Sequence, residues 1–144
     1  MTEPERPGER VVVGLDGSEP SKEALREGLR LAQALDLPLE AVMCWEDPLL
    51  FESYRAVDPE EFRVASEQLL ERTLAEVLGP DRPARLTARL LRGRPAERLI
   101  ECSEGARMLV VGSRGRGGVA GMLLGSVGSA LVAHARCPVL VVRH

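Results

Sequence analysis

The residues best suited to chemistry lie in one glycine-rich stretch, Gly112 to Ser126, which reads GSRGRGGVAGMLLGS. Glycine allows positive φ angles and lets backbone N–H groups approach a ligand closely, and successive N–H groups in such a turn form a concave anion site. The stretch ends at Gly125, where a helix is predicted to begin, and the first N–H groups of a helix also favour phosphate. Ser126 could either cap that helix or donate its hydroxyl to a phosphate. The stretch therefore predicts a phosphate-binding loop.

Two known phosphate signatures do not account for this loop. The pattern GxxxxGK[ST] is absent, because no lysine lies near it. A GxGxxA match exists at Gly115, Gly117 and Ala120, but it is misplaced. The dinucleotide fingerprint belongs in the first strand-to-helix turn, with an acidic residue about 20 positions later. We therefore reject the P-loop and dinucleotide-binding interpretations.

A second candidate is the turn Asp16–Gly17–Ser18, which follows the β-branched run at 10–15. A carboxylate at a strand end could hydrogen-bond a ribose hydroxyl or hold a Mg²⁺ that bridges phosphates. Asp-Gly-Ser is also ordinary turn chemistry, in which Asp16 shapes the turn and Ser18 caps the next helix. Ligand binding by Asp16 becomes the better interpretation if the strand at 10–15 lies beside the strand that precedes the glycine loop, because both turns would then lie at one edge of the sheet.

Apolar runs alternate with amphipathic stretches along the chain, which is typical of an α/β fold with a parallel sheet. We predict strands at 10–15, 39–45, 84–91, 107–111 and 138–143, the third being less buried than the others. Helices are predicted at 18–35, 62–78, 95–100 and 126–135, with a loop at 46–59. Strand order 3-2-1-4-5 would set the first and fourth strands side by side, and ligands of doubly wound sheets bind at such a switch point.

The composition sets the class of protein. The chain has 144 residues, 44% hydrophobic and 28% charged, which predicts one globular domain over 1–144 with 1–9 as a flexible lead-in. A net charge of −3 argues against nucleic-acid binding. The cysteines at 44, 102 and 137 match neither a disulfide framework nor metal-ligand spacing. No apolar run approaches the roughly 20 residues that cross a membrane, so we expect a cytoplasmic protein without membrane contact.

The spacing Gly112-x2-Gly115-x9-Gly125-Ser126 resembles the motif of nucleotide-binding universal stress proteins. Val11–Ser18 (VVVGLDGS) looks like the first strand and turn of that family, and His134–Arg143 (HARCPVLVVR) looks like its last strand. The resemblance runs from about residue 10 to the end. It implies a single-domain, five-stranded Rossmann-like parallel sheet of the adenine nucleotide alpha hydrolase type, in the order 3-2-1-4-5.

The resemblance also implies a site for ATP with Mg²⁺. In that site Asp16 contacts the ribose, the motif glycines and Ser126 hold the phosphates, and Cys44 lines the adenine pocket. An alignment shifted by one residue would place Met43 or Trp45 there instead. The nucleotide-binding residues expected on this basis are Leu15, Asp16, Gly17, Ser18, Cys44, Gly112, Ser113, Arg114, Gly115, Gly125, Ser126 and Val127. The family usually forms homodimers through its last strand, here Val139, Leu140, Val141 and Val142.

Three function classes follow. The first is a regulatory dimer of the stress response that binds ATP and hydrolyses it slowly at most. The second is a true ATPase or phosphotransferase, which would need a positioned base and a stabilising cation. Only Asp16 and Arg114 could serve, and neither lies in a recognised catalytic motif. The third is an interaction module that binds no nucleotide, against which the complete glycine motif argues. We expect the first class and assign no catalytic residue.

Overall fold

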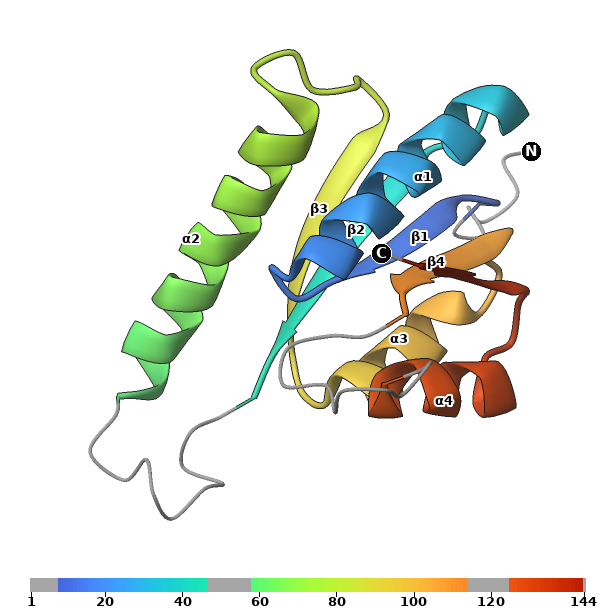
Figure 1. Ribbon diagram of the computed structural model, residues 1–144. Helices are drawn as coiled ribbons and strands as arrows, with labels where there is room; N and C mark the ends of the chain where they lie inside the picture. The colour runs from blue at the N-terminus through green and yellow to red at the C-terminus, as the bar shows by residue number, and fades with distance from the viewer. Residues whose placement is uncertain (1–7, 47–57, 114–124, 144) are drawn as a thin grey trace, which may run out of the picture.

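The computed structural model describes residues 8–46, 58–113 and 125–143. Within them, five parallel strands form one sheet in the order β3-β2-β1-β4-β5, which confirms the predicted doubly wound fold (Figure 1). The elements in chain order are β1 (Val11–Leu15), α1 (Glu19–Leu35), β2 (Leu39–Trp45), α2 (Pro59–Leu78), β3 (Leu86–Arg92), α3 (Pro95–Ser103), β4 (Met108–Gly112), α4 (Ser126–His134) and β5 (Val139–Val142).

The strand order reverses between β1 and β4. On one side β1 pairs with β2, and on the other side it pairs with β4, where Val13 lies opposite Val110. β5 continues beyond β4, with Val142 opposite Gly112. Because all these strands are parallel, the carboxyl ends of β1 and β4 lie at the same edge of the sheet. This is the edge where ligands of such folds bind.

Helices α1 and α2 cover one face of the sheet, and α3 and α4 cover the other (Figure 1). Each pair of helices packs on its own hydrophobic cluster, and successive residues of β1 alternate between the two. The buried residues of the α1–α2 cluster are Val11, Val13, Leu15, Ala24, Leu25, Ala32, Leu39, Ala41, Met43, Leu70, Leu74 and Val110. Those of the α3–α4 cluster are Val12, Val42, Leu99, Cys102, Leu109, Val111 and Leu131. Cys44 and Cys137 also pack against the α3–α4 cluster, so all three cysteines lie on that face.

Helix α1 begins and ends at residues that the sequence marks. Ser18 is the N-cap, and its Oγ accepts a hydrogen bond from the Ser21 N–H at 3.3 Å. Asp36 ends the helix in the left-handed conformation, with φ at 54°. Gly28 lets the helix pack closely on the sheet, because a Cβ at this position would clash with the side chain of Val13. The predicted helix at 18–35 is therefore confirmed.

Helix α2 differs from the sequence prediction in its first half. Only the second half of the predicted apolar stripe is buried, at Leu70, Thr73 and Leu74. Phe62, at the start of the stripe, is 37% exposed. The helix also begins earlier than predicted, at Pro59, because the carboxylate of Asp58 caps it by accepting a hydrogen bond from the Glu60 N–H at 3.0 Å.

β3 is an edge strand with exposed side chains, as predicted. Arginines over 82–98 form the solvated face that such a run favours, and several of them pair with acidic residues. The ion pairs are Arg82–Glu71, Arg85–Asp36, Arg89–Glu40 and Arg98–Glu101. Arg92 lies over Trp45, with its guanidinium carbon 5.6 Å from the ring centroid.

An ion-pair cluster around Glu40 is buried. The Glu40 side chain is 10% exposed, and its carboxylate bonds Nε of Arg10 at 2.6 Å and Nη1 of Arg89 at 2.8 Å. Arg10 also donates from Nη2 to the carbonyl of Cys102 at 2.9 Å, in the last turn of α3, where a cation is favourable. The cluster thus links the start of β1 to β2, β3 and α3.

The described part of the chain contains no helix long and apolar enough to cross a membrane. In the same residues, no group of three or more His, Cys, Asp or Glu side chains is placed to hold a metal ion.

Candidate functional site

The turn after β1 is held by its own side chains. The Ser18 N–H donates to Oδ1 of Asp16 at 2.9 Å, and the Ser18 hydroxyl donates to the same oxygen. Between them Gly17 adopts φ +82°, which favours glycine. Asp16 and Ser18 therefore shape this turn and cap α1, as the alternative interpretation of the sequence predicts. The contacts fix where the Asp16 carboxylate lies, at the carboxyl edge beside β4.

The two ends of the glycine-rich loop lie side by side. Gly112 is the last residue of β4, and the N–H of Ser113 donates to the carbonyl of Val142 in β5 at 2.8 Å. The N–H of Gly125 then donates to the carbonyl of Ser113 at 2.9 Å, so that the base of the loop is closed. Arg114 and Gly115, which are also predicted to contact the nucleotide, lie outside the described residues.

Helix α4 starts at the closed base of this loop. Gly125 occupies the N-cap position, with an extended backbone (φ −74°, ψ 174°), and no side chain of the described residues caps the helix. The interpretation that Ser126 caps α4 is therefore wrong, because Ser126 is already the first helical residue. The N–H groups of Ser126 and Val127 belong to the first turn, where no intrahelical carbonyl is within reach. They carry the partial positive charge of the helix dipole at this point.

The end of β4 packs directly on the first turn of α1. A Cβ at Gly112 would lie 2.6 Å from the carbonyl carbon of Pro20 and 2.7 Å from its oxygen. Since these are backbone atoms, no side-chain rotation could relieve the contact. Gly112 is thus required for packing, and it fixes the separation between the glycine loop and the helix that the Asp16 turn caps. The sequence gives no indication of this partner, because Pro20 and Gly112 are far apart in the chain.

The end of β2 supplies the third predicted element of the site. Cys44 is half-buried on the α3–α4 face, whereas Met43 belongs to the α1–α2 cluster and Trp45 is buried beneath Arg92. Burial raises the pKa of the Cys44 thiol to about 12, so this side chain is a neutral thiol at physiological pH. Which of the three residues lines an adenine pocket remains a prediction.

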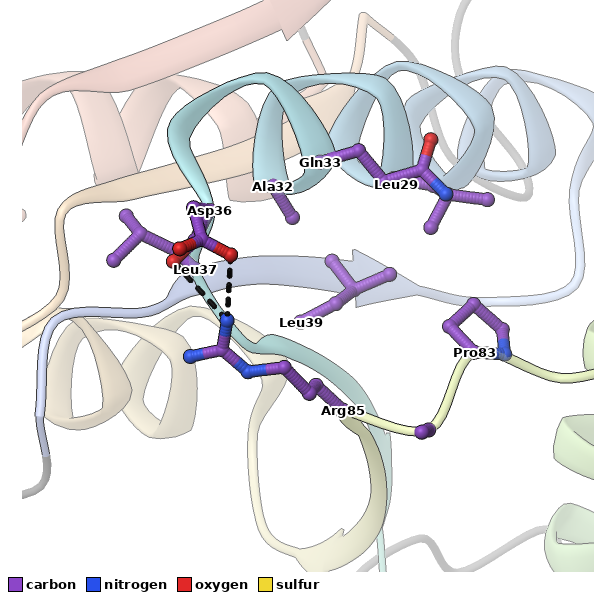
Figure 2. A pocket seen from close by; sticks show the side chains of 9 residues that line it. Leu29, Ala32, Gln33, Asp36, Leu37, Leu39, Pro83 and Arg85 are labelled. Atoms are coloured by element: carbon purple, nitrogen blue, oxygen red, sulfur yellow. Dashed lines mark hydrogen bonds and ion pairs between the residues drawn. The ribbon is translucent and has the colours of Figure 1, made fainter.

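A cavity of about 410 Å³ lies at the opposite end of the sheet (Figure 2). It is formed by the end of α1, the start of β2 and the segment before β3. Its lining residues are Leu29, Ala32, Gln33, Asp36, Leu37, Leu39, Pro83, Ala84 and Arg85. At its rim, Nη1 of Arg85 bonds both the carbonyl and Oδ1 of Asp36 at 3.1 Å (Figure 2). None of the predicted site residues that the structure describes lines this cavity, and the sequence pattern does not predict it.

The fold brings most of the predicted residues to one edge of the sheet. Leu15 to Ser18 lie at the end of β1 and in the turn after it, Gly112 and Ser113 lie at the end of β4, Gly125 to Val127 lie at the start of α4, and Cys44 lies near the end of β2. Pro20 of α1 and Leu69 of α2 also touch these turns, and sequence reasoning did not identify them. This arrangement defines a doubly wound α/β domain with two turns and a helix N-terminus at its switch point.

The chain belongs to the universal stress protein family, whose model matches residues 8–143. It is 38% identical over 133 residues to the universal stress protein Rv2623 of Mycobacterium tuberculosis, a match that covers 92% of this chain and 44% of that protein. The chain therefore spans less than half the length of this curated relative.

Solved structures share the fold. A universal stress protein in complex with cAMP has a TM-score of 0.70 at 24% identity, covering 93% of this chain and 96% of that one. The universal stress protein from Archaeoglobus fulgidus in complex with dAMP has a TM-score of 0.57 at 16% identity, covering 93% and 97%. At these identities the likeness concerns the fold alone.

Proposed function

We propose that this chain binds an adenine nucleotide, ATP with Mg²⁺, where β1 and β4 end, and that it acts as a regulatory dimer in the stress response. The observation that carries the proposal is the hydrogen bond between Gly125 and Ser113. It brings the end of β4 and the N-terminus of α4 to one point, and the Gly112–Pro20 contact sets that point against the first turn of α1. Phosphate is the group that such a collection of N–H donors favours.

Each predicted residue has a role in this proposal. The N–H groups at Gly115, Gly125, Ser126 and Val127 bind the phosphates, together with the Ser126 hydroxyl, which does not cap α4. Leu15, Asp16, Gly17 and Ser18 face the ribose, Cys44 lines the base, and Gly112 and Ser113 hold the loop base in place. Arg114 adds positive charge beside the phosphates. Mg²⁺ would neutralise the phosphate charge, and the Asp16 carboxylate is the oxygen ligand that we propose for it.

Two solved structures with the same fold support the proposal that the ligand is an adenine nucleotide. Their complexes contain cAMP and dAMP, which share an adenine, a sugar and a phosphate with ATP. The choice between these ligands is therefore open to direct measurement.

We expect Mg-ATP to bind the purified protein with a dissociation constant of about 1–10 μM, equivalent to roughly −7 to −8 kcal/mol. Calorimetric titration would measure this affinity, with AMP, cAMP and GTP as comparison ligands. A denatured sample would first be analysed for co-purified nucleotide. If no nucleotide binds and none is released, the protein belongs instead to the interaction modules of this family.

The contacts of Asp16 support no more than slow hydrolysis of ATP. A general base must be free to take a proton from the attacking water. Oδ1 of Asp16 instead accepts two hydrogen bonds from Ser18 and holds the turn in shape. We therefore assign Asp16 to ribose or metal binding, and we assign no residue to catalysis.

The homodimer is proposed to form through β5. Val139–Val142 is a half-buried edge strand of four apolar residues, and such an edge needs cover in a stable protein. This uncovered apolar edge favours pairing between two copies of the chain.

We expect Val141→Glu to convert the dimer into monomers, because a charge would have to be buried in the paired edge. Sedimentation velocity would measure the change, and circular dichroism would establish that the variant stays folded. Val64→Glu, at an exposed position of α2, is the matched control and should remain dimeric. A folded Val141→Glu dimer would point to a different interface.

A further inference from the structure

Helix α2 touches the turn that carries Asp16. Leu69 packs against Gly17 so closely that a Cβ at Gly17 would lie 2.9 Å from Cδ1, 3.0 Å from Cδ2 and 3.1 Å from Cγ of Leu69. All three branching atoms of the leucine side chain therefore cover one face of the turn. The contact joins residues more than 50 positions apart, and it is made by a helix with no predicted role in the site.

The position of α2 over this turn is fixed from two sides. Lys22, the only lysine of the chain, bonds Glu76 of α2 at 2.6 Å and Glu19 of its own helix at 3.0 Å, and its side chain is 13% exposed. On the sheet side, Leu70, Thr73 and Leu74 are buried. By contrast, Phe62 and Val64, in the first half of the helix, are 37% and 38% exposed. The second half of α2, which contains Leu69, therefore packs on the domain, whereas the start of the helix is exposed.

The turn under Leu69 is one that needs such support. Gly17 can adopt left- and right-handed conformations about equally, yet in the structure it adopts the left-handed one, at φ +82°. Both hydrogen bonds from Ser18 to Asp16 are made in this conformation. A bulky side chain lying against Gly17 restricts the alternatives that glycine would otherwise allow.

We infer that Leu69 is a positioning residue of the nucleotide site, which holds the Asp16–Ser18 turn in its binding-competent conformation without touching the ligand. The inference rests on the proposed nucleotide-binding function. It makes α2 a regulatory element, because displacement of α2 releases the turn and lowers nucleotide affinity. By linkage the effect is reciprocal, so that a bound nucleotide holds α2 more firmly against the domain.

The test compares Leu69→Ala with Leu78→Ala, a matched change at the last residue of the same helix, where the leucine packs on the same cluster. If the competent turn falls to about one-tenth of the population, nucleotide affinity falls about tenfold in Leu69→Ala. Leu78→Ala should keep the affinity of the unmodified protein, and Leu69→Met, which still covers Gly17, should restore it. Calorimetry with Mg-ATP measures all four proteins.

Amide hydrogen exchange without nucleotide gives a second readout that is independent of the proposed function. The amides of Ser18 and Ser21 donate within the turn and its cap, so they should exchange faster in Leu69→Ala and not in Leu78→Ala. Equal affinities for Leu69→Ala and Leu78→Ala would overturn the inference, as would unchanged exchange at Ser18 and Ser21. If the unmodified protein binds no nucleotide, the proposed function fails, and the exchange data alone decide whether Leu69 positions the turn.

Discussion

Gly125→Val is expected to lower nucleotide affinity by about a hundredfold while the protein stays folded. Gly125 stands where the loop meets α4, and a branched side chain would block the approach of phosphate to the first N–H groups of the helix. Losing one or two charge-assisted hydrogen bonds, at about 1.5–3 kcal/mol each, gives an effect of this size. The backbone of Gly125 is in an extended conformation that valine can adopt, so the fold should survive.

Ser129→Val is the matched control for this variant, since Ser129 lies one turn further along α4 and is exposed. Its affinity for Mg-ATP should match that of the unmodified protein in the same calorimetric titration. Gly115→Val should behave like Gly125→Val. Full affinity in both glycine variants would contradict the phosphate-loop assignment. Gly112 is unsuitable for this purpose, because its substitution would clash with Pro20 whether or not a ligand is present.

Glu40→Ala is expected to destabilise the domain by about 3 kcal/mol, because it leaves the buried guanidinium of Arg10 without its carboxylate. This value lies at the lower end of the range for broken buried pairs, since Arg89 is 44% exposed and can turn to water. The loss is a large part of a typical folding free energy of 5–15 kcal/mol. It should lower the thermal unfolding midpoint by about 10 °C, which calorimetry or circular dichroism would measure.

Two further variants make this prediction specific. Glu71→Ala removes a carboxylate from an exposed pair with Arg82, and it should leave the unfolding midpoint almost unchanged. The double variant Arg10→Met with Glu40→Leu replaces the buried pair by apolar side chains and should regain much of the lost stability. A midpoint for Glu40→Ala equal to that of Glu71→Ala would show that the buried cluster contributes little.

The fold could be predicted from the sequence because its signals are local. The β-branched run before Asp16 indicates a strand buried on both faces, and Ser18 marks the start of α1 through its own side chain. The alternation of strands and helices then predicts a parallel sheet, and family resemblance gives its order. The observed sheet confirms these expectations, with strand boundaries that shift by one or two residues.

The contacts that shape the site could not be predicted in the same way. Leu69 on Gly17 and Pro20 on Gly112 are pairs distant in sequence, and each depends on how two elements meet in space. The apolar stripe of α2 predicts burial from Phe62 onward, but periodicity does not reveal where a helix leaves the surface of its domain. The sequence leaves open whether Ser126 caps α4 or binds phosphate, because glycine and serine both suit an N-cap and stand side by side at Gly125 and Ser126; the structure places the cap at Gly125.

The positions of the three cysteines allow motion of the α3–α4 layer to be measured by thiol labelling. Cys44, Cys102 and Cys137 all lie on the α3–α4 side, and burial raises the pKa of each thiol. Cys102 is buried, whereas Cys44 and Cys137 are partly exposed, so a thiol-reactive dye added to the native protein labels Cys102 at a rate governed by how often that layer separates from the sheet. Movements of α1 and α2 leave the signal unchanged, so the natural sequence allows the dynamics of one half of the sandwich to be timed without introducing any probe.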